Sequence, residues 1–293
     1  MATSGLQTTI KEGRERETAK WYVLYGRYAS LSVIDELQRV KDAGGDVRIE
    51  EFFVPVEVKK ISKGGSTVVK KSLYTGHYIF IKALKDDIVR LKHTPSFTTD
   101  IRFLHPRMGD ASLITVPERE MQSFRNAVLA MNNEVEYFRP TSEELEAGDR
   151  VRIIGGLFDG VEGILEHKRG HDNRRITVAV SSMLAIRTLD IEPENIQVLE
   201  FAKAPSPIVA RNMQIGTDKK ASYTSRAYKE IKSLLQLSKE HLERYRDQGI
   251  LSEEEYLSAQ ILFRRYSALQ LTGKLREQHA EAMLNLKKAL ERK

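Results

Sequence analysis

Two groups of basic side chains carry the residue types that bind phosphate. One group flanks the Gly64-Gly65 pair and the other occupies the polar segment 167–175, and the candidate contact residues are Lys59, Lys60, Lys63, Lys70, Lys71, Arg169, Arg174 and Arg175. Lysine and arginine neutralise phosphate groups without reading a base sequence, so both groups indicate a nucleic-acid backbone as a partner. The alternative is a solvated arm and a solvated loop with no ligand, and the residue types alone do not decide between the two.

Patterns typical of catalysis are missing from the sequence. It has no cysteine, which excludes disulfides, thiolate nucleophiles and Cys-ligated zinc or iron–sulfur clusters. The seven histidines are scattered, and the glycine-rich stretch 155–160 is followed by Val161 where a phosphate-binding loop needs lysine. No nucleophile stands beside a base in a recognisable motif. We therefore expect no enzymatic activity, no cofactor and no bound metal.

Length and charge set the broad class of the protein. With 293 residues, 41% of them hydrophobic, the chain is long enough for two or three domains. Its formal net charge of +6 suits nucleic acid or an acidic protein surface as a partner, although most of the excess lies after residue 216, where 16 lysines and arginines stand against 11 acidic residues. No stretch approaches the roughly 20 apolar residues that span a bilayer, and the polar start lacks a signal-peptide core. We expect a cytoplasmic protein without membrane contact.

The region 20–132 has the pattern of a mixed α and β domain. The expected order is strand, helix, strand, hairpin, strand, helix, strand and helix, with the first strand at 20–26 and the last helix beginning at Pro117. Ser30 or Ser32 is expected to cap the first helix. This order suits a split β-α-β sandwich around an antiparallel sheet, and thus the α+β class.

The remaining chain predicts a second β domain and a helical extension. Five short strands in about fifty residues from Asp149 onward predict a small closed barrel. Helical periodicity then begins near Tyr223, breaks at Gly249, and resumes after a Ser252–Glu255 capping box to run, interrupted near Gly273, to the end, which predicts a helical hairpin. The predicted limits are a disordered leader (1–19), a β-α-β domain (20–132), a linker (133–147), a barrel (148–200), a second linker (201–222) and a helical extension (223–293).

Two stretches resemble motifs of a known family. Residues 149–165 (DRVRIIGGLFDGVEGIL) are similar to a KOW motif, whose hallmark glycine corresponds to Gly160 or Gly163. Upstream, KWYVLYG, FFVPVEVKKI, the basic hairpin, KKSLYTGHYIFIK and LKHTPSFTTDIRFL follow the order of an NGN domain. Together the similarity covers residues 20–200. The chain thus resembles bacterial NusG-type transcription elongation and antitermination factors, in particular specialised paralogues of the UpxY and LoaP types, which implies an NGN domain followed by an SH3-like KOW barrel.

The resemblance also implies a binding site for RNA polymerase. In the family the NGN domain presents an apolar, aromatic surface to the clamp helices of the largest polymerase subunit, which closes the DNA cleft and suppresses pausing. The family's Phe-Pro-Gly-Tyr-type turn corresponds to residues 74–77, where Thr75 replaces the proline and His77 the tyrosine, so that the contact is weaker or retuned. The implied binding residues are Trp21, Tyr22, Tyr74, Gly76 and His77. Gly76 is expected for its backbone freedom, and one of the neighbours Trp21 and Tyr22 is expected in the core.

Further partners follow from the same resemblance. The basic hairpin is expected beside DNA near the upstream fork. Family barrels bind a small-subunit ribosomal protein or Rho through a strand-loop-strand in which this chain has Met183 at the position of the expected aromatic. The helical extension faintly resembles C-terminal modules of the SHOCT type, and we expect it to bind a partner or to self-associate. The rival interpretation is a ribosome- or RNA-binding KOW protein. Target operons, the recruitment element and the direction of the effect on pausing do not follow from the sequence.

Overall fold

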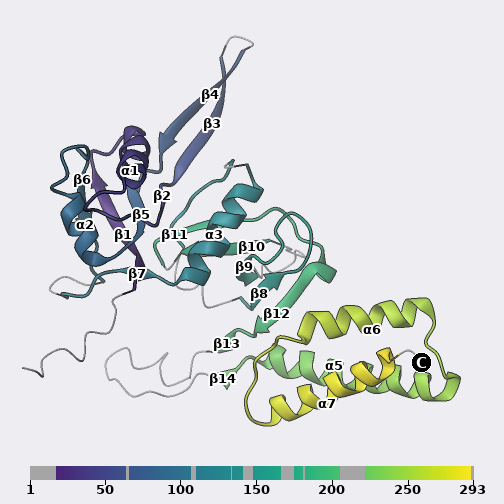
Figure 1. Cartoon of the computed structure of the whole chain (residues 1–293). Helices are drawn as coiled ribbons and strands as arrows, with labels where there is room; N and C mark the ends of the chain where they lie inside the picture. Colours follow the sequence, from purple (N-terminus) through teal and green to yellow (C-terminus); the bar gives the residue numbers. More distant parts are fainter. Residues whose placement is uncertain are drawn as a thin grey trace, which may run out of the picture. The chain divides into compact units, whose positions relative to one another are not determined.

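The computed structural model divides the chain into two compact units, Met1–Glu118 and Arg119–Lys293. It is a mixed α+β protein, as predicted, with six α-helices among the described residues (Figure 1). None of these helices is long and apolar enough to cross a membrane. The structure describes residues 18–63, 66–106, 110–132, 134–140, 148–165, 175–180, 182–204 and 222–291, with the backbone alone for 59–63, 66–68, 204 and 222.

An antiparallel sheet of five strands forms the centre of the first unit. β5 and β6 flank β1, β2 lies beyond β5, and β7 pairs with the start of β1. The predicted alternation of strands, helices and a hairpin is present, with one additional short strand, β7. The elements are β1 (Lys20–Arg27), α1 (Ser32–Ala43), β2 (Glu51–Phe53), β3 (Val56–Lys63), β4 (Ser66–Leu73), β5 (Tyr78–Ala83), α2 (Lys85–Leu91), β6 (Asp100–Phe103) and β7 (Thr115–Val116).

Helices α1 and α2 contribute to one hydrophobic core with the sheet. Tyr22 and Leu24 of β1 lie in this core together with Leu37 of α1 and Ile88 of α2. The residue before α1 is Leu31, which makes no side-chain capping bond, but Oγ of Ser30, one of the two predicted caps, accepts from the N–H of Ser32 at 3.4 Å. The apolar period of the sequence gives the helix its buried face.

Strands β3 and β4 form a separate two-stranded hairpin, as predicted. They pair in register from Val56 opposite Leu73 to Lys63 opposite Ser66. The hairpin extends beyond the five-stranded sheet of its unit (Figure 1). An isolated two-stranded ribbon is marginally stable at best, because it has no core of its own.

A curled, five-stranded antiparallel sheet begins the second unit after helix α3 (Glu118–Ala130). The strand order is β11-β10-β9-β8-β12, which leaves β11 and β12 as the edges of half a barrel. Its elements are β8 (Arg150–Ile153), β9 (Glu162–Leu165), β10 (Ile176–Val180), β11 (Leu184–Arg187), the 3-10 helix η1 (Pro193–Asn195) and β12 (Ile196–Glu200). The five predicted strands are thus present. The unit boundary falls after Glu118, the first residue of α3, a helix that the sequence pattern groups with residues 20–132. The domain limits stay a prediction.

Two glycines of the KOW-like stretch serve different purposes. Gly160 has a φ of 77° in the turn that precedes β9, a conformation that favours glycine. Gly163 lies inside β9, where an added Cβ would stand 2.5 Å from the carbonyl oxygen of Thr177. The first glycine therefore allows the turn, and the second allows close approach of β9 and β10.

The C-terminal region consists of three helices, so the predicted helical hairpin is wrong in number. They are α5 (Ser225–Gln248), α6 (Glu253–Tyr266) and α7 (Gly273–Leu290), preceded by the short pair β13 (Lys203–Ala204) and β14 (Ser222–Tyr223). The predicted break at Gly249 and the Ser252–Glu255 capping box are confirmed. The predicted interruption near Gly273 is also confirmed, since α6 ends at Tyr266 and α7 begins at Gly273, whose φ is 59°.

Candidate functional site

Residues 74–77 form a tight turn between β4 and β5 in the first unit. The N–H of His77 donates to the carbonyl oxygen of Tyr74 at 2.8 Å, which closes the turn. The carbonyl oxygen of His77 in turn accepts from the N–H of Gly26 at 2.9 Å, which ties the turn to β1. The side chains of the turn are therefore held in place by the sheet behind them.

Gly76 serves this turn by its small size, so the expectation of backbone freedom is wrong. Its φ lies outside the left-handed region, and an added Cβ would stand 2.6 Å from Cε1 of Tyr74 and 2.9 Å from Cε2 of Tyr78. The left-handed conformation falls on His77 instead, with a φ of 50°. Glycine is thus required because two tyrosine rings close over it.

Aromatic side chains meet around the turn. The rings of Tyr74 and Tyr78 have centroids 6.1 Å apart, and His77 makes an edge contact with Tyr25 at 6.1 Å. Tyr25 and Tyr78 are also direct cross-strand partners in β1 and β5. These separations are those of favourable aromatic pairs. Tyr25 is 36% exposed, whereas Tyr74 and His77 are half-buried, so the cluster presents a partly accessible aromatic surface.

The other two predicted contact residues, Trp21 and Tyr22, are both buried. Trp21 is 1% exposed and its Nε1–H donates to Glu118 at 3.1 Å, while Tyr22 is 5% exposed and belongs to the core with α1 and α2. Alternation along β1 sends the two rings to opposite faces of the sheet, as expected, but neither ring is accessible. They support the sheet that carries the turn.

Sequence reasoning missed the accessible residues at the end of β1. Tyr28 is 85% exposed with a φ of 55°, and the guanidinium of Arg27 lies 4.9 Å from the centroid of its ring. An aromatic residue in the left-handed region is uncommon and costs roughly 1–2 kcal/mol. The signal in the sequence was the second aromatic pair, Tyr25 and Tyr28, which continues past the point where the strand pattern ends.

The lysines of the hairpin are brought together by the strand register. Lys59 stands directly opposite Lys70, and Lys71 stands opposite Val58. Like charges at opposed positions are unfavourable in an isolated sheet. Lys70 and Lys71 are exposed, while the side chains of Lys59, Lys60 and Lys63 lie outside the described part.

The candidate residues of the curled sheet are less closely grouped. Met183 is half-buried in the turn between β10 and β11. Arg175 is exposed and pairs with Asp190, Nε to Oδ1, at 3.2 Å. Arg169 and Arg174 lie outside the described residues. The described residues of this loop therefore show one paired arginine and no cluster of positive charge.

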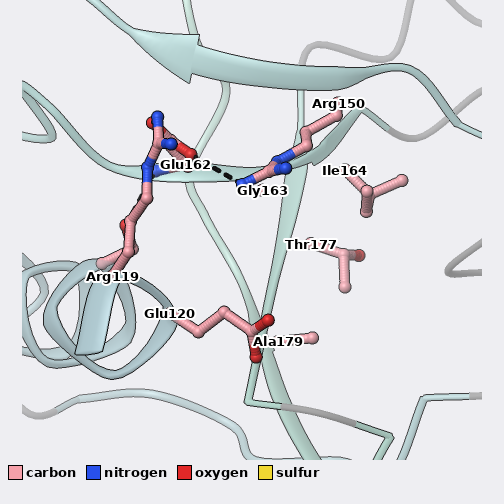
Figure 2. Close-up of a pocket in the computed structure, with 9 residues that line it drawn as sticks. Arg119, Glu120, Arg150, Glu162, Gly163, Ile164, Thr177 and Ala179 are labelled. Atoms are coloured by element: carbon pink, nitrogen blue, oxygen red, sulfur yellow. Dashed lines mark hydrogen bonds and ion pairs between the residues drawn. The ribbon is translucent and has the colours of Figure 1, made fainter. Parts of the chain in front are cut away.

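A pocket in the second unit lies between α3 and the curled sheet (Figure 2). Glu162, 8% exposed, stands at its edge and is the common partner of Arg119, Arg150 and Arg152, with Arg150 Nη2 at 3.2 Å and Arg152 Nη2 at 2.7 Å. Burial raises the pKa of Glu162, but hydrogen bonds from Arg152 and Arg119 outweigh it, so the net shift of the pKa is downward. A carboxylate held by three arginines joins α3 to β8 and β9, and its chemistry is that of a structural ion network.

Comparison with known proteins adds no relative. No protein-family model matches the chain, and no curated protein matches it either. Among the described residues, no group of three or more histidine, aspartate or glutamate side chains is arranged to hold a metal ion.

Proposed function

We propose that this protein is a NusG-type transcription elongation and antitermination factor that binds the clamp helices of RNA polymerase through the turn 74–77. The proposal rests on the ordered resemblance over residues 20–200. The observation that supports it most is the pre-organised aromatic turn at the position where the family's polymerase-binding turn is expected. We accordingly propose an NGN domain for 20–132 and an SH3-like KOW barrel for 148–200.

The turn has the physical properties of a protein-binding element. Tyrosine rings bury a large area and lose little conformational entropy, which makes them effective anchors. His77 has a left-handed backbone, and its Nδ1 is buried without a hydrogen-bond partner among the described residues. Both features cost stability, and such costs are concentrated at functional sites. We assign the contact to Tyr74, His77 and Tyr25, with Gly76 as the residue that lets the rings close.

The basic hairpin is proposed as a contact to DNA near the upstream fork. Lys70 and Lys71 are adjacent, exposed lysines on β4, and the strand register sets a further lysine, Lys59, opposite Lys70. A phosphate backbone beside the hairpin would neutralise such grouped positive charges. The contact would be independent of base sequence, because lysine binds phosphate as a point charge. For the barrel we propose a ribosomal protein or Rho as the partner at Met183.

A pulldown with isolated clamp helices of RNA polymerase tests the polymerase contact. The double variant Tyr74→Ala, His77→Ala is expected to lose at least about tenfold in affinity, since two anchor residues are removed. Tyr228→Ala is the control, because Tyr228 is 55% exposed and lies on α5. Unchanged binding of the double variant would exclude the proposed site. Crosslinking to ribosomal RNA, with none to polymerase, would support the rival RNA-binding function.

A further inference from the structure

Helix α6 has an inner face and an outer face. It packs on α5, α7, β12 and η1, and its buried residues are Ala259 and Tyr266, whose hydroxyl donates to Glu230 of α5 at 2.7 Å. With about 3.6 residues per turn, Leu257 and Ile261 lie on the opposite side of the helix. Leu257 is 55% exposed and Ile261 is half-buried. The outer face therefore presents two apolar side chains that are one helical turn apart.

Charged side chains flank this apolar pair in a regular arrangement. The first turn of α6 carries the acidic residues Glu253 and Glu254, and the last turn carries Arg264 and Arg265. Helical spacing places Glu253 and Arg264 along one flank of the apolar pair, and Glu254 and Arg265 along the other. Three of these four side chains are exposed, and that of Arg265 is half-buried. Each flank thus has a negative charge at the start of the helix and a positive charge at its end.

This outer face is complementary to itself under a two-fold rotation. When two copies of α6 lie antiparallel, with the axis at the level of residue 259, Leu257 of each copy faces Ile261 of the other. On both flanks, the acidic start of one helix then faces the basic end of the other. The helix dipole favours acidic starts and basic ends in any helix, but it does not place these charges on both sides of an exposed apolar pair. The charge pattern therefore specifies a second copy of the same helix as the partner.

We propose that the protein forms a two-fold symmetric dimer in which the outer faces of two α6 helices pack antiparallel against each other. A parallel arrangement would bring like charges together at both ends, so the charges also set the direction of the pairing. Surface ion pairs contribute little individually and one helix face is a small interface, so the dimer dissociates on dilution. The dimer goes beyond the proposed polymerase contact and does not depend on it.

Analytical ultracentrifugation of the full-length chain over a range of concentrations tests the proposal. A reversible equilibrium between monomer and dimer is expected. Leu257→Ala should raise the dissociation constant of the dimer by about tenfold, because a two-fold interface buries this side chain twice. Leu284→Ala is the matched control, since Leu284 is 51% exposed but lies on α7. The proposal is overturned if the unmodified chain is monomeric throughout its soluble range, or if Leu257→Ala dimerises no more weakly than Leu284→Ala.

Charge reversal tests the antiparallel pairing itself. Glu253→Arg and Arg264→Glu each place like charges opposite each other at two positions of the dimer, so each variant alone should dimerise about tenfold more weakly. An equimolar mixture of the two restores opposite charges at both positions and should associate as tightly as the unmodified chain, a recovery that a misfolded variant would not show. Glu277→Arg, an exposed position on α7, is the control and should leave dimerisation unchanged. A mixture that associates no better than either variant alone would overturn the proposal.

Discussion

In the turn 74–77, the unusual backbone conformation expected at Gly76 is found at His77 instead. Gly76 is held between the rings of Tyr74 and Tyr78, while His77 adopts the left-handed backbone. Histidine is among the residues that enter this region more readily than most. The aromatic surface of the turn therefore depends on the absence of a side chain at one position and on strain at the next.

Replacement of Gly76 by alanine tests this description. The added Cβ would stand under 3.0 Å from both tyrosine rings, so the rings must move. Overpacking of this kind typically costs about 1–3 kcal/mol of stability. Gly45→Ala is the control, because Gly45 has open space around its Cα and no left-handed φ. Urea unfolding should show a loss for Gly76→Ala alone, and equal stabilities would contradict the packing role.

Sequence reasoning located this turn but not the cause of its shape. A pattern of residue types shows that tyrosine, glycine and histidine are adjacent, whereas ring contacts arise only when β1 and β5 are in register. The burial of both Trp21 and Tyr22 has the same origin: alternation predicts opposite faces for them, but whether each face is covered depends on tertiary packing.

At the scale of elements, a carboxylate joins helix α1 to the segment that leads into β6. Oε2 of Glu36 accepts from the backbone N–H groups of Thr98 at 2.7 Å and Thr99 at 3.1 Å, and Oε1 accepts from the Thr98 hydroxyl. Burial raises the pKa of Glu36, but these hydrogen bonds outweigh it and the net shift of the pKa is downward. The ionised form of Glu36 is therefore the one that stabilises the folded first unit.

The sign of this shift determines a pH dependence. Because the pKa of Glu36 is lower in the folded state, its ionised carboxylate contributes to the free energy of unfolding above the unfolded pKa of about 4.3. This contribution is lost as the pH falls through the folded pKa. Glu36→Gln should cost about 1–3 kcal/mol at pH 7 and weaken the loss of stability on acidification. Urea unfolding of the first unit between neutral and acidic pH measures both, with the exposed Asp35→Asn on the same helix as control. An unchanged pH profile would count against Glu36.

Element types were predicted better than element number. The strands and helices of the first unit and the five strands of the curled sheet follow from apolar periodicity, which is local. The interruption near Gly273 was predicted, but the length of the turn 267–272 was not, because this turn has few of the residues typical of turns before Thr272 and Gly273. A helical apolar period alone does not show where one helix ends and the next begins.

At the scale of the whole molecule, the division into two compact units predicts that unfolding is not a single two-state transition. A variant that destabilises only the second unit should therefore leave the first unit folded.

Ser252 offers such a variant, because it caps α6: its Oγ accepts from the Glu255 N–H at 3.3 Å. Ser252→Ala should cost about 1 kcal/mol in the second unit. Hydrogen exchange by mass spectrometry should show faster exchange in α6 while β1 and α1 are unaffected. Equal acceleration in α1 would mean that the units unfold together.

The pairing of β13 with β14 has a consequence for protein engineering. Lys203 stands opposite Tyr223, so the two ends of segment 205–221 enter and leave from neighbouring strands. A foreign domain whose own termini lie close together meets the same spacing. Because Ala204 is paired with Ser222, an insertion of a fluorescent reporter between them is expected to leave this strand pair in place.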